Sequence, residues 1–250
     1  MTHFEIYALV KSRGNFLKIA KILLGSLFPV LLICTSPILS TDVKTIQEGK
    51  LDLGNWDQIA SPLVSLNGKW EFYWKQFLSK DFSQNQPVYI PLLPWRLLQN
   101  KYKIHSRGYA TYRLLLLFPE TELGKHFALK IPIIGTAYRL FINGVKKIEV
   151  GKVGISAATS RAKYSPEIVE FSPKRKEVEI VLHVSNFQNR DGGQKSPILL
   201  GGSSRVYSDY LQKVSVDLLL FGSLFTMGSL SYRFVRTATK RKVFYPFWYF

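Results

Sequence analysis

Residues 137–144 of this 250-residue chain have the sequence AYRLFING, and this stretch decides the fold. Its first six residues alternate, so that Tyr138, Leu140 and Ile142 point to one side of an extended strand. An Asn-Gly pair follows, the dipeptide that two-residue hairpin turns favour because both residues tolerate a positive φ. The stretch therefore predicts a β-hairpin whose first strand has one buried face.

The same alternation recurs on both sides of this hairpin. In residues 178–184 apolar side chains occupy every second position, which places His183 on the opposite, outer face. Residues 70–74 place three aromatic rings on one face of another strand. We expect further strands, with no helix of comparable length between them, near residues 88–92, 110–118, 128–134, 148–153 and 166–171. So many short strands within residues 41–213 predict an all-β, jelly-roll β-sandwich.

An apolar segment precedes the β-rich region. Residues 22–38 carry no charge and follow four basic residues, the pattern of a secretory signal or an uncleaved anchor. No clear cleavage site follows the segment. Residues 1–40 are therefore expected to form a signal peptide or an N-terminal membrane anchor.

A second apolar segment follows the β-rich region. Residues 214–232 contain Asp217 as their single charge, and as a helix they would be about 30 Å long, the thickness of the hydrocarbon core of a bilayer. Five basic residues come next in the chain. We expect a transmembrane helix over residues 214–235, and at residues 236–250 a cytoplasmic basic tail or the start of a truncated second membrane helix.

The basic residues also orient the chain, because lysine and arginine next to membrane segments stay in the cytoplasm. They precede the first apolar segment and follow the second, so residues 41–213 are expected outside the cytoplasm. Of the net charge of +17, the two flanking regions supply 7 and residues 41–213 supply 10. This surplus favours anionic surfaces such as membrane lipid headgroups or acidic saccharides. Nucleic acid, which the charge alone would suggest, lies on the wrong side of the membrane and is excluded as a partner.

A series of motifs runs through residues 50–205. They are LNGKWEFYW at residues 66–74, Pro94-Trp95, GYATYR at residues 108–113, AYRLFING at residues 137–144, GKVG at residues 151–154, and VSNF at residues 184–187 with Arg190, Gly192 and Gly193. Together they resemble the extracellular domain of bacterial seven-transmembrane receptors with diverse intracellular signalling modules. The segment from Asp217 to Tyr232 fits the first membrane helix of such receptors.

Domains of this family are similar to the galactose-binding-like jelly roll that precedes the barrel of β-galactosidases and β-glucuronidases. The resemblance implies a sensor for a carbohydrate or another small ligand, held in the bacterial inner membrane with the β-domain facing the periplasm or the extracellular side. In the family, seven helices couple this sensor to a cytoplasmic output module. The chain ends at Phe250 after one complete helix. We therefore expect a truncated or frameshifted receptor, or a free-standing sensor that needs other membrane helices or a signalling partner.

Binding of a saccharide requires aromatic faces for the apolar side of the sugar ring and planar polar groups for its hydroxyls. In this sequence we expect rings from Trp95 and Tyr109, and hydrogen-bond donors from Arg107, Arg139 and Arg190. Trp95, Arg107 and Arg190 are the strongest candidates because they are expected in loops.

Other polar and aromatic residues are better explained by structure. Tyr138 alternates at strand spacing and is expected in the core, and Asn186 is expected to order a strand end by bonding backbone groups. The carboxylates Glu120 and Glu122 fall in a turn without an acid and base environment. A single cysteine and four scattered histidines cannot assemble a thiolate metal site. We expect no enzyme activity, no metal and no cofactor.

Two functions compete on these grounds. The first is a membrane-tethered sensor of an extracytoplasmic ligand, a saccharide or another small molecule. The second is the accessory domain of a glycoside hydrolase-like protein, which predicts a catalytic barrel encoded directly downstream.

Overall fold

The structure is a computed structural model, and it describes residues 41–42, 46–54, 56–57, 61–78, 86–194 and 196–242. The expected signal peptide or anchor over residues 1–40 lies outside these residues, as does any second membrane helix after residue 242. The chain divides into a β-domain that ends at Tyr210 and a second unit that includes the helix from Leu211 onward.

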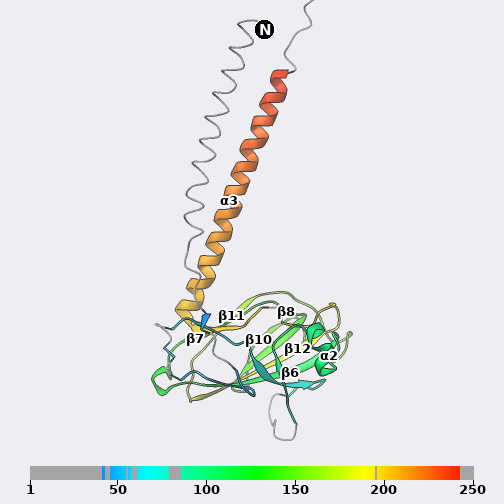
Figure 1. The fold of residues 1–250 in the computed structure, drawn as a ribbon, viewed down its shortest axis with the longest axis vertical. Helices are drawn as coiled ribbons and strands as arrows, with labels where there is room; N and C mark the ends of the chain where they lie inside the picture. Colours follow the sequence, from blue (N-terminus) through cyan, green and yellow to red (C-terminus); the bar gives the residue numbers. More distant parts are fainter. Residues whose placement is uncertain are drawn as a thin grey trace, which may run out of the picture. The chain divides into compact units, whose positions relative to one another are not determined.

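The β-domain contains two main sheets (Figure 1). The smaller sheet has five strands in the order β1 (Thr41–Asp42), β3 (Leu63–Ser65), β14 (Leu199–Gly202), β7 (Phe127–Ile131) and β11 (Glu167–Phe171). The larger sheet has the order β10 (Val145–Val150), β9 (Ala137–Ile142), β12 (Glu177–Asn186), β6 (Gly108–Leu117), β4 (Lys69–Trp74) and β5 (Val88–Pro91), with β2 (Lys50–Asp52) beside β6. A short pair joins β8 (Ile134–Gly135) and β13 (Gly193–Gln194). This is the all-β, jelly-roll β-sandwich that the alternation predicts.

The core lies between the two main sheets. A single cluster of buried apolar side chains includes Leu114 and Ile180 from the larger sheet and Phe127 and Leu129 from the smaller one. The ring centroids of Phe118 and Phe127 lie 4.9 Å apart. The apolar stripe of β12 is buried, as its period of two requires.

The hairpin predicted from AYRLFING is confirmed. Strands β9 and β10 pair antiparallel, with Ile142 opposite Val145. Asn143 and Gly144 between them have φ values of 49° and 75°. Positive φ at both central residues is the condition for the tight turn whose twist matches that of the flanking strands.

One local expectation is wrong, and a second is confirmed with an addition. The first concerns Trp95, which was expected in a loop but is the first residue of a helix, α2 (Trp95–Tyr102). Pro94 precedes this helix, and Lys103 ends it with a left-handed φ of 52°. The second concerns the outer face of β12: His183 lies there as expected, and it is also buried, with 3% of its surface exposed. Its ring nitrogen contacts the carbonyl of Leu78, because the chain after β4 folds over this face.

A 3-10 turn, η1 (Glu120–Glu122), follows β6. The C-terminal helix α3 (Ser203–Lys242) follows β14 directly. Among the described residues, α3 is the one helix long and apolar enough to cross a membrane, over Ser203–Thr237. Its large apolar side chains are exposed, with Phe221 69% accessible. A lipid environment would cover such a surface, which agrees with the membrane helix expected over residues 214–235.

Candidate ligand-binding site

Three loops meet at one end of the larger sheet, and a buried asparagine holds two of them together. Asn186, the last residue of β12, is completely buried. Its Nδ2 donates to the carbonyl of Ser106 at 2.7 Å and to that of Asn189 at 3.0 Å, and its Oδ1 accepts from the Asn189 amide at 3.0 Å. Because one nitrogen binds both carbonyls, loops 103–107 and 187–192 lie side by side. This is the backbone-ordering role that the sequence predicts for Asn186.

The third loop, residues 160–164, is joined to loop 187–192 by hydrogen bonds from Gln188 and Asn189. Gln188 donates from Nε2 to the carbonyl of Ser160 at 2.9 Å. Asn189 donates from Nδ2 to the hydroxyl of Tyr164 at 3.3 Å. The Tyr164 side chain is 52% exposed, so its ring stands at the surface. We call the surface formed by loops 103–107, 160–164 and 187–192 the loop edge.

Helix α2 contacts loop 187–192 of the loop edge through its first two residues. The backbone amide of Trp95 donates to the carbonyl of Gly192 at 2.9 Å. The Trp95 indole is fully buried, and its Nε1 donates to the hydroxyl of Tyr112 at 2.8 Å. At the surface, Arg96 and Asp191 form an ion pair at 3.0 Å. Trp95 is therefore a core side chain whose ring offers no face to a ligand in this structure.

Arg107 and Arg190 both belong to the loop edge and are exposed. Arg107 follows Ser106 and Arg190 follows Asn189, the two residues whose carbonyls share the Asn186 amide. Within the described part of the chain, neither guanidinium has a hydrogen-bond or ion-pair partner. The loop edge thus presents two planar donor groups that lack a partner among the described residues, and the exposed ring of Tyr164 in the same surface.

The other two expected site residues lie on the outer face of the larger sheet. Tyr109 is half-buried, and its ring lies 4.8 Å from the Phe77 ring. Arg139 donates from Nη2 to Glu149 at 2.8 Å. Arg139 also stands directly opposite His183 in the strand register. Tyr109 and Arg139 therefore belong to the sheet face and not to the loops that carry Arg107 and Arg190.

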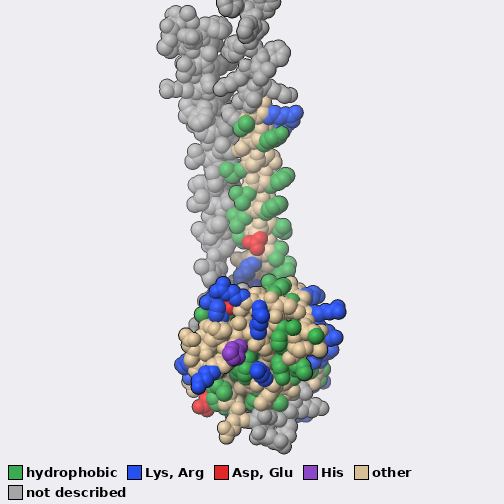
Figure 2. All heavy atoms as spheres, turned by 90° about the vertical axis from the view of Figure 1, so that its right-hand side faces the viewer, with side chains coloured by type: hydrophobic (Ala, Val, Ile, Leu, Met, Phe, Trp, Pro, Cys, Tyr) green, Lys and Arg blue, Asp and Glu red, His purple; other side chains and the backbone are tan. Residues whose placement is uncertain are grey.

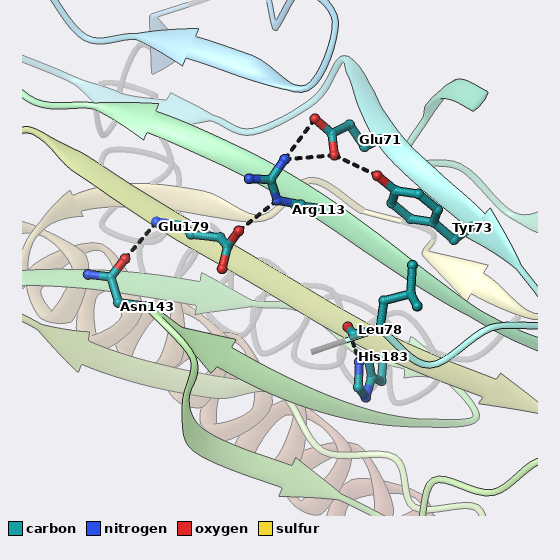
Figure 3. Close-up of polar contacts among 7 residues, drawn as sticks. All are labelled: Glu71, Tyr73, Leu78, Arg113, Asn143, Glu179 and His183. Atoms are coloured by element: carbon teal, nitrogen blue, oxygen red, sulfur yellow. Dashed lines mark hydrogen bonds and ion pairs between the residues drawn. The ribbon is translucent and has the colours of Figure 1, made fainter. Parts of the chain in front are cut away.

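His183 lies on this outer face with its ring toward the Leu78 carbonyl (Figure 3). Its ring lies between those of Phe77 and Phe141, at 4.9 and 5.0 Å. Its Nε2 lies 2.7 Å from the Leu78 carbonyl, which identifies Nε2 as the protonated nitrogen of the neutral ring. Burial lowers the pKa of His183, and the charge of Arg139 acts in the same direction. His183 therefore fastens the segment after β4 to the sheet as a neutral imidazole.

Next to it, three strands are joined by a row of charged groups (Figure 3). Arg113 on β6 donates to Glu71 on β4 at 2.9 Å and to Glu179 on β12 at 2.6 Å. The hydroxyl of Tyr73 donates to Glu71 at 3.0 Å. Burial and this contact with a carboxylate raise the pKa of Tyr73. The row occupies both carboxylates, so we interpret it as a structural link across the sheet.

The five residues that we predict from the sequence as ligand-binding lie in three different parts of the structure. Arg107 and Arg190 belong to two adjacent loops of the loop edge, Trp95 is buried in α2, and Tyr109 and Arg139 lie on the sheet face. Sequence reasoning missed Tyr164, because no period or spacing relates it to the other loops. Within the described residues, no three His, Cys, Asp or Glu side chains converge as metal ligands.

No protein-family model matches the chain, and no curated protein matches its sequence. Among solved structures, the chain is similar to a protein assigned as a β-galactosidase from Bacteroides fragilis, with 17% identity and a TM-score of 0.42 over 55% of this chain and 22% of that chain. A β-glucuronidase from Ruminococcus gnavus has 14% identity and a TM-score of 0.41 over 55% and 29%. Bacteroides uniformis β-glucuronidase 2 has 18% identity and a TM-score of 0.42 over 55% and 17%. The matched region spans less than a third of each of these proteins.

Proposed function

We propose that the chain is a membrane-tethered sensory domain that binds a saccharide at the loop edge, as the extracytoplasmic part of a signalling receptor. The loop edge carries this proposal, because it combines the exposed Tyr164 ring with the guanidiniums of Arg107 and Arg190, which have no partner among the described residues. A sugar ring has an apolar face that stacks on an aromatic ring and a rim of hydroxyls that accept from planar donors. The buried amide of Asn186 positions the two arginine-bearing loops before any ligand arrives.

The exposed apolar surface of α3 supports the tether. The basic residues that follow the apolar segment support an orientation in which the β-domain lies at the periplasmic or extracellular side of a bacterial inner membrane. Coupling of this helix to other membrane helices is part of the same proposal.

We propose binding without turnover. Glycoside hydrolysis needs two carboxyl groups on either side of the scissile bond, about 5 to 9.5 Å apart. The carboxylates near the candidate residues are engaged instead: Asp191 pairs with Arg96, and Glu149 pairs with Arg139. The competing function, an accessory domain of a glycoside hydrolase-like protein, would share the binding site but would have a catalytic barrel beside it.

The test uses the full chain in phosphatidylcholine nanodiscs and a panel of neutral and acidic oligosaccharides, with binding followed by calorimetry. We expect at least one saccharide to bind, and Tyr164→Ala to weaken its binding. Tyr164→Phe keeps the ring and should bind nearly as the parent does. Tyr207→Ala removes another exposed tyrosine of the β-domain and serves as the matched control. Absence of binding across the panel, or equal effects of the two alanine variants, would contradict the proposal.

A further inference from the structure

The loop edge carries many more cations than anions. Among loops 103–107, 160–164 and 187–192, Asp191 is the one acidic residue, and Arg96 already neutralises it. The same three loops carry five exposed cations: Lys103, Arg107, Arg161, Lys163 and Arg190. Figure 2 looks onto the α2 side of the β-domain and shows Lys and Arg side chains spread over it, with few Asp or Glu.

This charge density is fixed by the hydrogen bonds between the loops. Gln188 binds the carbonyl of Ser160 and Asn189 binds the hydroxyl of Tyr164, so the segment that carries Arg161 and Lys163 is held on both sides. Like charges that the fold holds close together repel one another, and an anionic ligand relieves that repulsion. A neutral sugar would leave it in place.

We infer that the ligand of the loop edge is an acidic oligosaccharide that carries carboxylates, a uronate oligomer; this inference rests on the proposed saccharide-binding function. The guanidinium fork matches a carboxylate in a bidentate geometry, and such charge-assisted hydrogen bonds are about twice as strong as neutral ones. The exposed ring of Tyr164 provides a stacking face for a sugar unit between successive carboxylates. The lysines around the arginines raise the local concentration of a polyanion and its association rate.

The experiment compares trimers of galacturonate, guluronate and mannuronate with their methyl esters, which have the same rings but no charge. The full chain is held in phosphatidylcholine nanodiscs, whose headgroups carry no net charge. We expect at least one acid trimer to bind about tenfold more tightly than its ester, with an affinity that falls as salt is added. Arg107→Gln and Arg190→Gln should each weaken the acid trimer about fivefold and leave the ester unchanged.

Arg175→Gln is the matched control. Arg175 is exposed and lies in the turn before β12, whereas the loop edge begins at its last residue, Asn186. A ten-residue strand at about 3.3 Å per residue separates the two positions by about 30 Å. We expect Arg175→Gln to bind the acid trimer as the parent chain does.

The outcomes separate the inference from the proposed function. Equal binding of acids and esters would overturn the inference and leave the saccharide sensor intact. Absence of binding to any saccharide would overturn both. If Arg175→Gln weakened the acid trimer as much as Arg107→Gln, the attraction would come from diffuse charge and the inference would fail. Tighter binding of a single-stranded oligonucleotide than of any trimer would identify a nucleic-acid surface instead.

Discussion

Replacing Asn186 by alanine is expected to loosen the loop edge and destabilise the β-domain. The side chain is completely buried and makes three hydrogen bonds of 2.7 to 3.0 Å to backbone groups of two loops. Each such bond contributes about 0.5 to 1.5 kcal/mol net, so the substitution should cost about 3 kcal/mol. For a domain of this size, that loss lowers the melting temperature by about 6 to 12 °C.

The assay is thermal unfolding of the full chain in detergent micelles, followed by tryptophan fluorescence. Asn100→Ala is the control, because Asn100 lies exposed on α2 and its replacement should change stability by less than about 0.5 kcal/mol. Asn186→Asp should destabilise at neutral pH at least as much as alanine, because a carboxylate has no proton to donate to the two carbonyls. A melting temperature for Asn186→Ala equal to that of Asn100→Ala would refute the idea that this amide holds the loops.

Three further expectations follow from buried groups and from the membrane helix. Trp95→Phe and Tyr112→Phe should each cost about 1 to 3 kcal/mol by leaving one buried polar group unpaired, and the double variant should cost less than their sum in urea titrations. Burial lowers the pKa of His183, so as the pH drops the unfolded chain binds a proton at this histidine before the folded chain does. The free energy of unfolding should therefore fall as the pH drops below about 6.5. His183→Gln, which keeps a side-chain N–H, should flatten that fall in stability measurements from pH 5 to 8. Alkaline phosphatase fused after residue 210 should be active in bacterial cells, and inactive when fused after residue 242; the reverse result would invert the proposed orientation.

The strands could be predicted because their causes are local. Alternation along β9 and β12 indicates which face of the sheet the opposite sheet covers. The Asn-Gly pair indicates a turn that few other residues can form. No comparable sequence pattern marks helix α2. It has eight residues, and Trp95 and Leu98 are the buried ones, too few for a helical period to stand out from a loop.

The outer face of the larger sheet shows a second limit of sequence patterns. A period of two assigns His183 to the outer face correctly, yet it says nothing about what lies on top of that face. The segment after β4 covers it: Thr111 donates to the Gln76 carbonyl at 2.8 Å and accepts from the Leu78 amide at 3.0 Å. Only the path of the folded chain shows that a polar position is buried.

The loop edge could be predicted in part for a similar reason. Arg107 and Arg190 were expected because exposed arginines in loops can bind a ligand, and both are exposed. Their proximity depends on Asn186, which bonds the backbone of both loops, and no periodicity encodes such a bond between loops. Tyr164 enters the site through Asn189, a contact across two loops that are far apart in the sequence.

Trp95 shows why a conspicuous residue of the motif series need not be one of the proposed ligand-binding residues. A Cβ placed on Gly192 would lie 2.4 Å from the Trp95 ring, and one on Gly193 would lie 2.8 Å from it. Both positions accept only glycine because the indole packs against them, and the indole in turn is fixed by Tyr112. Trp95 and the two glycines therefore form buried packing that supports loop 187–192 of the loop edge. Tyr164 and Arg107 are exposed and lie outside the motifs, so replacing them should alter ligand preference at little cost in stability.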